Sequence, residues 1–418
     1  MPKRSFLARL KSNLVCLALI TIFPSAGWAT EAFTPTVWGD NAWNQQSIPS
    51  TAVEIASISA GDGHVLAIRS DGQLVAWGRN DAGQTTPPPP PPEKPEPVRY
   101  GAVAAGARHS FAYTSVGLIS WGAITAVPTS LAFGPPRAIA AGHDFNVAVD
   151  FTGKVLVAGS NAHGQLDVPG AAGSNVVSVA AGEGHVVALQ DDGHIIAWGK
   201  NDFGQATVPT SAQRALSIAA GRDFSAALLY DGSVVVWGRG ANDYLRPPPE
   251  ASGASKVAAG ADFIVVETDE TVVAWGAPGS PGLPPTSIKH TALLTAGGKA
   301  AVAVHAPYFT KLPGLVQVKE GDSAELSAQV SHTKGVTTFW STTSAEPNAL
   351  TLKFSQVGHS FSGAYTITAQ YETGYSMTAT GVLLVLTPPT VRVSQPGSGS
   401  CTKMKASPSG ARPAGPDH

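Results

Sequence analysis

Short apolar runs, separated by polar turns that contain glycine, recur along most of the chain. In one representative stretch, VVSVAAG (176–182) and HVVALQ (185–190) are followed by Asp192-Gly193 and then by HIIAWG (194–199). Apolar runs of this length predict β-strands, and Asp-Gly between two of them predicts a hairpin with a type I′ turn. The short piece ATVP (206–209) predicts a fourth strand. Four strands in roughly 40 residues are the expected content of one β-propeller blade.

Two phrases repeat with this pattern, and each occurs seven times. The first is Trp-Gly, in which alanine replaces tryptophan in the fourth copy. Its copies are 39, 44, 37, 40, 39 and 38 residues apart, and they begin at Trp38, Trp77, Trp121, Ala158, Trp198, Trp237 and Trp275. The second phrase is small-Ala-Gly, which runs ahead of the first and ends at Gly61, Gly106, Gly142, Gly182, Gly221, Gly260 and Gly297. A period of this length is typical of propellers.

The two ends of the array each carry half a unit. VWGDNAWNQQSIP (37–49) has the second half of a unit, and TAGGKAAVAV (295–304) has the first half. Together they complete one unit, and a ring closed in this way leaves no exposed sheet edge. The sequence therefore predicts an all-β fold in which residues 30–304 form a seven-bladed β-propeller with a composite closing blade.

The tryptophans of the Trp-Gly phrase stand at the ends of apolar strands, where core positions are expected. Because an indole covers a large apolar area, we predict that they pack between neighbouring blades as structural residues. The alternative is a ring of exposed tryptophans that binds sugars or aromatic ligands. The prediction concerns Trp38, Trp77, Trp121, Trp198, Trp237 and Trp275.

The chain changes character after His305. About seven short strands are predicted there, which indicates an immunoglobulin-like β-sandwich over residues 305–387. Trp340 falls at the third-strand tryptophan position, and Tyr365 falls at the position of the tyrosine corner. Ala328 and Ile367 stand where the usual disulfide would be, so an apolar core without a bridge is expected. Residues 388–418 are rich in Pro, Gly and Ser and predict a disordered tail.

The N-terminus has the order of a secretory signal peptide over residues 1–29, with basic residues, an apolar run and small residues in turn. The run from Leu14 to Phe23 is short for a membrane span, so none is expected after signal removal. We therefore expect a secreted, periplasmic or cell-surface protein, and a monomer. The formal charge of −2 gives no reason to expect a nucleic-acid partner. Cys16 and Cys401 are the two cysteines, so the exported chain has no intrachain disulfide.

The motifs AAGxxHxxAL, DGxVxAWG and NxxGQ can be read in residues 180–205, with Ile195 at the valine position. They resemble the repeats of the regulator of chromosome condensation family in their short bacterial version. The resemblance covers roughly two-thirds of the chain and implies a propeller. The best-known nuclear members bind chromatin and promote guanine-nucleotide exchange on a small GTPase. That function is not carried over, because this chain is expected to be exported and is slightly acidic.

The repeats are also similar to those of a secreted seven-bladed inhibitor of class A β-lactamases. That inhibitor binds through aromatic residues two positions past the glycine of the small-Ala-Gly phrase. None of the corresponding residues here is aromatic: they are Gly63, Arg108, Asp144, Gly184, Asp223, Asp262 and Lys299. Because aromatic anchors typically carry an interface, this pattern argues against lactamase inhibition.

The loops after the small-Ala-Gly phrases are where the repeats diverge, so we predict that binding residues lie there. Their mixed charges favour a polar contact, and the predicted residues are Arg108, Asp144, Arg222, Asp223, Asp262 and Lys299. One repeat position in these loops holds histidine (His64, His109, His185), phenylalanine (Phe145, Phe224, Phe263) or alanine (Ala300), which indicates packing rather than metal binding. No nucleophile, phosphate-cradling or metal-spacing motif is found, so no catalytic residue, metal or cofactor is expected.

The predicted function is non-enzymatic binding, in which propeller loops hold a protein or a surface polysaccharide. One alternative is an inhibitor of a secreted enzyme such as a β-lactamase. Another is a carbohydrate-active enzyme that uses loop carboxylates. The proline-rich insert at 85–97 predicts a rigid polyproline loop on the propeller rim.

Overall fold

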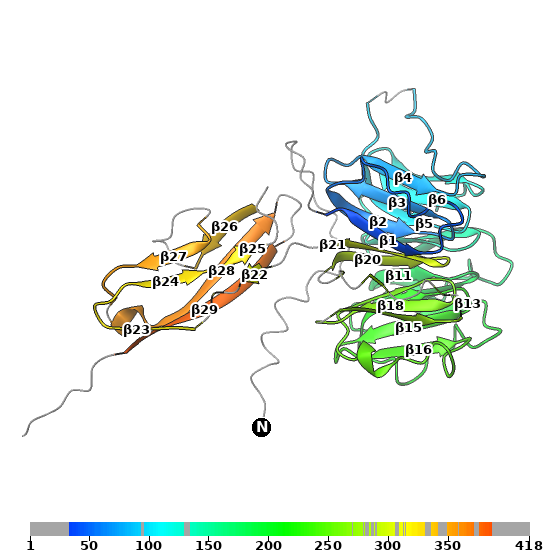
Figure 1. Ribbon diagram of the computed structural model, residues 1–418. Helices are drawn as coiled ribbons and strands as arrows, with labels where there is room; N and C mark the ends of the chain where they lie inside the picture. The colour runs from blue at the N-terminus through cyan, green and yellow to red at the C-terminus, as the bar shows by residue number, and fades with distance from the viewer. Residues whose placement is uncertain are drawn as a thin grey trace, which may run out of the picture.

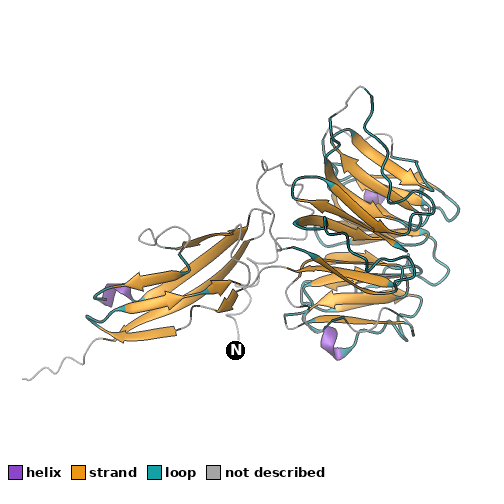
Figure 2. Ribbon diagram, turned by 45° about the horizontal axis from the view of Figure 1, so that its top comes forward, coloured by secondary structure: helices purple, strands orange, loops and turns teal. Residues whose placement is uncertain are grey.

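The computed structural model describes residues 33–386, except 93–95, 129–133, 270, 279, 281–283, 286–287, 289–290, 306–308, 312, 314, 331–335, 342–348, 358 and 372–375. The predicted signal peptide (1–29) and C-terminal tail (388–418) lie outside the described residues. Two all-β lobes can be followed in Figures 1 and 2: a propeller, and a smaller pair of sheets formed by the C-terminal strands.

Seven antiparallel sheets of three strands each form the described part of the propeller. In six sheets the strands follow one another along the chain: β2 (Ile55–Ala60), β3 (His64–Arg69), β4 (Leu74–Gly78); β5 (Tyr100–Ala105), β6 (His109–Thr114), β7 (Gly117–Gly122); β8 (Ala138–Ala141), β9 (Phe145–Val149), β10 (Val155–Gly159); β11 (Val176–Ala181), β12 (His185–Gln190), β13 (Ile195–Gly199); β14 (Ala215–Ala220), β15 (Phe224–Leu229), β16 (Val234–Gly238); β17 (Lys256–Ala259), β18 (Phe263–Glu267), β19 (Val272–Gly276). Two 3-10 helices, η1 (Gly170–Gly173) and η2 (Pro249–Ala251), lie between blades.

The seventh sheet is built from both ends of the array, which confirms the predicted composite blade. It joins β20 (Thr291–Gly297) and β21 (Ala300–His305) to β1 (Pro35–Gly39). The antiparallel register of β1 with β21 runs from Pro35 opposite Val304 to Gly39 opposite Ala300. Figure 1 shows the blue β1 beside the olive β21. The first strand of each blade contacts the first strand of the next, and β20 contacts both β17 and β2, so the ring is closed.

At the hairpin turns, the predicted strands are confirmed and the predicted turn type is wrong. The glycine of each Asp-Gly pair has φ near +80°, but the aspartate does not have a positive φ. The amide of Gly72 donates to the carbonyl of Arg69 at 2.9 Å, which describes a type I turn followed by a left-handed glycine. The Asp71 carboxylate accepts the amide of Gln73 at 3.0 Å, so aspartate serves the turn through its side chain instead.

The fourth strand predicted at 206–209 is also wrong, because a self-contained loop occupies that place. The side-chain oxygen of Asn201 accepts the amide of Ala206, and that of Gln205 accepts the amide of Phe203, both at 2.9 Å. Asn41, Asn80 and Asn161 close their loops in the same way. These N-x-x-G-Q loops satisfy their backbone internally, so they do not need to pair with the third strand.

In five blades the tryptophan of the Trp-Gly phrase bonds the blade to the one before it. The indole N–H of Trp77 donates to the backbone carbonyl of Gln45 in the preceding N-x-x-G-Q loop, at 2.7 Å. Trp121, Trp198 and Trp237 repeat this bond to Gln84, Gln165 and Gln205 at 2.9–3.0 Å, and Trp275 reaches Leu245 at 3.1 Å. Five of the indoles are buried, and that of Trp275 is partly buried. The structure therefore places these tryptophans between blades as packing residues, and five of them also bond the preceding loop, whereas the buried indole N–H of Trp38 has no hydrogen-bond partner among the described residues.

The blade with Ala158 in place of tryptophan adjoins the smallest buried apolar cluster between blades. Only Ala104, Phe111 and Ala148 are fully buried in this cluster of the described residues. The side chain of Asn146 donates to the carbonyl of Ala126 at 2.8 Å, as the hydroxyls of Ser110 and Ser225 donate to the carbonyls of Gln84 and Gln205 in other blades. With Ala158 in the phrase, this blade lacks the indole bond that Trp121 and Trp198 donate to the preceding loop in their blades.

The C-terminal lobe has two principal sheets with an apolar core between them. One sheet has the order β23 (Leu315–Lys319), β29 (Ser376–Leu386), β28 (Gly363–Tyr371), β26 (Val336–Trp340), and the other pairs β24 (Ala324–Ser327) with β27 (Thr351–Phe354); β22 (Phe309–Lys311) pairs with β25 (Gln329–Val330), and η3 spans His359–Phe361. Trp340, Ala328 and Ile367 are all buried in this core, and no cysteine is present there. The hydroxyl of Tyr365 donates to the carbonyl of Phe361 at 2.8 Å.

Candidate functional site

The loops after the small-Ala-Gly phrases converge on a central channel. Its volume is about 120 Å³, and its wall consists of the alanine and glycine of every phrase. The residue after each glycine stands at the channel mouth. We call this set the mouth ring: Asp62, Ala107, His143, Glu183, Arg222, Ala261 and Gly298.

Backbone hydrogen bonds join neighbouring members of the mouth ring. The amide of Glu183 donates to the carbonyl of Arg222, and the amide of Arg222 donates to that of Ala261, at 3.2 and 2.9 Å. The amide of Ala261 continues the belt to Gly298 at 2.7 Å. Because the belt uses backbone atoms, the side chains of the mouth ring are free to vary without loss of the ring.

The glycine of the phrase is required by close packing around the channel. A Cβ added to Gly106 would lie 2.3 Å from a ring carbon of His109 and 2.8 Å from the carbonyl oxygen of Gly142. At Gly221 the same atom would lie 1.9 Å from the ring of Phe224. The histidine or phenylalanine three positions later therefore packs directly on the glycine, which explains the spacing in the motif.

The repeated histidines are buried hydrogen-bond donors. The Nε2 atom of His185 lies 3.0 Å from the hydroxyl of Ser225 in the next blade, and that hydroxyl donates to the carbonyl of Gln205 at 2.8 Å. Since the Ser225 hydroxyl already donates its proton to Gln205, it can only accept from His185, and the proton of that bond is on Nε2. Burial lowers the pKa of His185 to about 4 and that of His64 to about 3, so both are neutral at pH 7.

A pairing between repeats explains why this position alternates between histidine and phenylalanine. Each histidine is followed, in the next blade, by a polar partner at one fixed position: His64 by Ser110, His109 by Asn146 and His185 by Ser225. Where the position holds an apolar residue, the equivalent next-blade residue is also apolar: Val186 after Phe145, Ile264 after Phe224 and Ala301 after Phe263. Comparing adjacent repeats, rather than aligned ones, would have revealed this pairing in the sequence.

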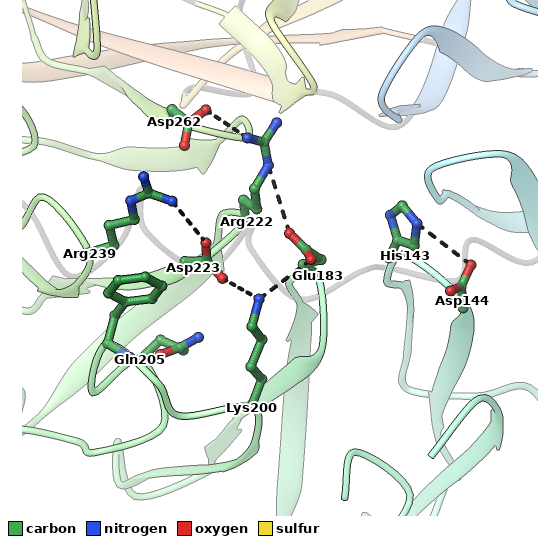
Figure 3. Close-up of polar contacts among 10 residues, drawn as sticks. His143, Asp144, Glu183, Lys200, Gln205, Arg222, Asp223, Arg239 and Asp262 are labelled. Carbon is green, nitrogen blue, oxygen red and sulfur yellow. Dashed lines mark hydrogen bonds and ion pairs between the residues drawn. The ribbon is translucent and has the colours of Figure 1, made fainter. Parts of the chain in front are cut away.

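Charged side chains of the mouth ring and the next residues form a connected group on one side of the channel (Figure 3). Arg222 lies between Glu183 at 3.8 Å and Asp262 at 3.3 Å. Lys200 bridges Glu183 at 3.4 Å and Asp223 at 2.9 Å. The structure thus brings three predicted binding residues, Arg222, Asp223 and Asp262, into one group.

The predicted residues differ in how accessible they are. Asp223 is 5% exposed and pairs with Lys200 and Arg239, so its carboxylate is engaged within the protein. Hydrogen bonding to Asp223 raises the pKa of Lys200, which fixes this ion pair in its charged form. Asp223 supports the loops, whereas Arg222 has about half of its side chain exposed.

The other three predicted residues lie around the mouth without joining this group. Arg108 contacts Asp81 at 3.3 Å, and Asp144 lies 3.8 Å from the imidazole of its neighbour His143 (Figure 3). Lys299 is exposed and forms no ion pair with the part of the chain that the structure describes. The predicted residues therefore surround the channel on one face, although they do not form a single cluster.

Aromatic side chains reach the same face from the N-x-x-G-Q loops, which the sequence analysis did not consider. Trp43 and Phe203 are 43% and 48% exposed. The guanidinium of Arg79 stacks 4.5 Å from the ring of Trp43, and that of Arg239 lies 5.1 Å from the ring of Phe203. The residue two positions before the glutamine of each loop was the signal: Trp, Ala, His or Phe. We call this side of the propeller, with both loop families, the channel face.

The two loop families are held against each other by backbone contacts. The amide of Arg79 donates to the carbonyl of Gly63, and that of Lys200 to Gly184, both at 2.8 Å. A Cβ on Gly63 would lie 3.0 Å from the Trp43 ring. The opposite side, which carries the Asp-Gly hairpins, is called the turn face.

Comparison with known proteins identifies the repeats. Residues 55–84, 137–165, 176–205 and 216–244 match the regulator of chromosome condensation (RCC1) repeat. A 78-residue stretch is 38% identical to the ultraviolet-B receptor UVR8 of Arabidopsis thaliana, and this stretch is 17% of the chain and 18% of UVR8. The match therefore spans less than a fifth of that receptor.

Solved structures share the propeller fold. Prp20p of Saccharomyces cerevisiae, described together with its binding to Gsp1p and histones, is 20% identical with a TM-score of 0.51, covering 66% of this chain and 92% of Prp20p. Human WBSCR16 is 19% identical with a TM-score of 0.53, covering 66% of this chain and 99% of its own. At these identities the likeness shows the fold alone.

The described residues contain neither a helix suited to cross a membrane nor a metal-binding group. No helix there combines the length and apolar character that a membrane crossing needs. No group of three histidine, cysteine, aspartate or glutamate side chains in those residues is placed to hold a metal ion.

Proposed function

We propose that this chain, which carries RCC1 repeats in a closed seven-bladed propeller, is an exported, non-enzymatic binding protein that holds a protein partner on its channel face. The observation that carries the proposal is the combination of exposed aromatics and charges on that one face. Tryptophan and arginine are the residues most enriched at the centres of protein interfaces. Trp43 with Arg79, and Phe203 with Arg239, supply two such pairs.

The rigidity of the ring supports this proposal. The loops are fixed by indole bonds, the backbone belt and internally closed N-x-x-G-Q turns, so little ordering is needed when a partner binds. Propellers of the same fold bind proteins: Prp20p is described as binding Gsp1p and histones, and as the yeast RCC1 bound by Kap60. For this chain we infer only the general property, a protein partner.

The two faces allow a matched test. Trp43→Ala with Phe203→Ala removes the exposed aromatics of the channel face, while Phe151→Ala with Tyr230→Ala removes exposed aromatics of the turn face. The tagged variants are used to capture proteins from extracts of the exported fraction, alongside a surface polysaccharide array. The proposal requires a protein that the wild type and the turn-face variant capture and the channel-face variant loses. Equal capture by both variants would place binding elsewhere.

Export itself rests on the N-terminal sequence pattern. If residues 1–29 are removed as a signal peptide, the mature protein begins at Thr30. Mass spectrometry of the protein recovered outside the cytoplasm measures this directly. An intact Met1 on cytoplasmic protein would contradict it.

For the C-terminal lobe, we propose an immunoglobulin-like domain over 305–387 that acts as a spacer or adhesion module. Three features support it: β23 pairs parallel to β29, Trp340 lies in the core, and the Tyr365 hydroxyl bonds the backbone four residues upstream. Limited proteolysis should then release two resistant fragments with a boundary near His305. A cut inside 315–386 before one near His305 would argue against a separate domain.

Inhibition of a secreted enzyme is a second candidate. The small-Ala-Gly loops lack aromatic anchors, but Trp43 and Phe203 supply aromatic side chains on the same face from neighbouring loops. The direct measurement is the hydrolysis rate of a chromogenic β-lactam by a class A β-lactamase with increasing amounts of this protein. An unchanged rate at micromolar concentration removes this candidate.

A further inference from the structure

The connection between β4 and β5 is longer than its counterpart in a later blade. It runs from Gln84 to Arg99, and the counterpart runs from Gln205 to Arg214. Both arginines end the connection in the same way, because each backbone carbonyl accepts an amide from the hairpin of the blade that follows. Arg99 follows Gln84 by 15 positions, whereas Arg214 follows Gln205 by nine. The longer connection therefore has six additional residues, and it contains the proline run 87–92.

Shorter connections of the ring are held against the propeller by a buried alanine. In four of them the amide of this alanine donates to the carbonyl of a proline three positions earlier, at 2.9–3.0 Å. The alanines are at most 2% exposed, and they are Ala52, Ala172, Ala212 and Ala251. No alanine stands between Gln84 and Arg99. The connection with the proline run therefore lacks the contact that fixes the others to their blades.

The proline run is exposed to solvent and forms no hydrogen bond within the described part of the chain. Pro88, Pro89, Pro90 and Pro92 are exposed, and Pro87 and Pro91 are partly exposed. Proline has no backbone N–H to donate, and no carbonyl of the run accepts a bond from the described residues. The rings and the carbonyl oxygens of the run are therefore both available to a partner.

The covalent structure of the run restricts it to one conformation. Proline fixes φ near −65°, and a residue that precedes proline is pushed toward an extended ψ. The residues from Pro87 to Pro91 meet both conditions, which favours a polyproline II helix with three residues per turn. Six such residues span about 19 Å at ~3.1 Å each. Because the run is already ordered, a partner that binds it loses little affinity to conformational entropy.

The chemistry of the run selects one kind of protein partner. The exposed edge of a partner's sheet cannot pair with it, because pairing needs N–H donors that proline lacks. A groove that accepts an α-helix is excluded, because consecutive prolines cannot form one. A charged surface finds no charged side chain in the run. Aromatic side chains fit, because their flat rings pack on pyrrolidine rings, and an indole or phenol can donate to the exposed carbonyls.

We propose that Pro87–Pro92 is a docking ligand for a protein partner whose groove is lined by aromatic side chains. The run connects the two faces of the propeller. On the channel face the amide of Thr86 donates to Gly83, and on the turn face the amide of Tyr100 donates to Gly72. The site is therefore separate from the channel face and from the binding proposed there. Since the run carries no charge, this binding should be insensitive to salt.

The probe for the test is profilin, a protein with an aromatic groove that accepts runs of prolines. Profilin labelled with 15N is titrated with the full-length mature protein and observed by NMR, with and without a decaproline peptide as competitor. We expect saturable shifts of the groove resonances that decaproline removes and that high salt leaves in place. The absence of shifts, or shifts that decaproline does not remove, would overturn the proposal.

Two variants remove the ligand in different ways. Replacing residues 86–98 by residues 207–213 installs the shorter connection of a later blade, with its buried alanine Ala212. This replacement should abolish the profilin shifts and leave the melting temperature equal or higher, because it restores a contact that the longer connection lacks. Combining P89A, P90A and P91A keeps the length of the connection and should also abolish the shifts.

A matched control changes the same connection outside the run. Glu96 and Pro97 are exposed, so Glu96→Ala with Pro97→Ala should keep the profilin shifts. Equal loss in this control and in the triple alanine variant would contradict recognition of the run itself. A lower melting temperature of the triple alanine variant with unchanged shifts would show a structural role and overturn the proposal.

A second copy of this chain is the other occupant to test, because Trp43 and Phe203 are exposed aromatics of the protein itself. Sedimentation of the wild type and of the loop replacement over a range of concentrations distinguishes the two. We expect both to sediment as monomers. Self-association that the loop replacement abolishes would assign the run to a second copy and overturn the proposal of a separate partner.

Discussion

Acid should destabilise this propeller well above the range in which carboxylates titrate, because neutral histidines are buried between blades. His64 and His185 have pKa values of about 3 and about 4 in the fold, caused first by burial. In the unfolded chain an imidazole titrates near 6.5. Between these values the unfolded state binds protons that the folded state does not. The stability contribution is therefore complete above pH 6.5 and is lost as the pH falls toward 4.

The size of the effect follows from the separation of the pKa values. A pH of 5 lies about 1.5 units below the imidazole pKa of about 6.5 in the unfolded chain. Each unit of this difference corresponds to about 1.36 kcal/mol of unfolding free energy. Each buried histidine then removes about 2 kcal/mol of unfolding free energy on going from pH 7 to pH 5, and the two together about 4 kcal/mol. Burial also lowers the pKa of His109, which acts in the same direction.

The assay compares chemical denaturation of the wild type and His185→Phe at pH 7 and pH 5. Phenylalanine fits this position, because Phe145 and Phe224 occupy it in other blades with their rings on the same glycine. The variant should lose about 2 kcal/mol less than the wild type over this range. His194→Gln, at an exposed position, serves as the control. Identical losses in the wild type and His185→Phe would refute the reasoning.

Three further predictions test contacts described above. Ser225→Val should cost about 1–3 kcal/mol by leaving His185 without its acceptor, and adding His185→Phe should recover most of this loss; additive losses in a denaturation cycle would disprove the pairing. Trp198→Ala should cost about 3–5 kcal/mol through the lost core volume and indole bond, against less than about 1 kcal/mol for Arg222→Ala, and equal midpoints in urea would contradict this. Deleting 30–49 removes β1 and exposes β21, so we expect a lower melting temperature and self-association in light scattering; an unchanged monomer would show that closure is dispensable.

The repeat made the architecture predictable from the sequence. Seven copies of two phrases, with half a unit at each end, fixed the blade number and the composite closure that β1 and β21 display. Burial of the phrase tryptophans followed from their place at the ends of apolar strands, as Trp77 and Trp198 show. A sequence pattern that recurs in seven repeats does not depend on the residue found in any single repeat, and this is why these predictions were reliable.

Local chemistry was harder to predict, because it depends on which atoms meet. Asp-Gly indicated a hairpin, but its turn type depended on whether Asp71 used its backbone or its carboxylate, and it used the carboxylate. The prediction of a fourth strand was wrong because the side chains of Asn201 and Gln205 accept the backbone amide hydrogen bonds within their own loop.

The candidate site was only half visible in the sequence. Comparing aligned positions in one loop family selected Asp223, which is buried in an ion pair, and passed over Trp43 and Phe203 in the other family. The contact between the two families runs from one blade to the next, for example from Trp43 to Gly63. A comparison within each repeat cannot reveal it.

The composite blade makes completion of the ring depend on synthesis of the whole array. Pro35 pairs with Val304, 269 positions later. At roughly 5–20 residues per second, the first strand waits on the order of 15–50 seconds for its partner to be made. A chain that ends before β21 has a first strand, β1, without the strand it pairs with. Ring closure is therefore possible only for a chain that has been synthesised through β21, because only such a chain pairs its first strand.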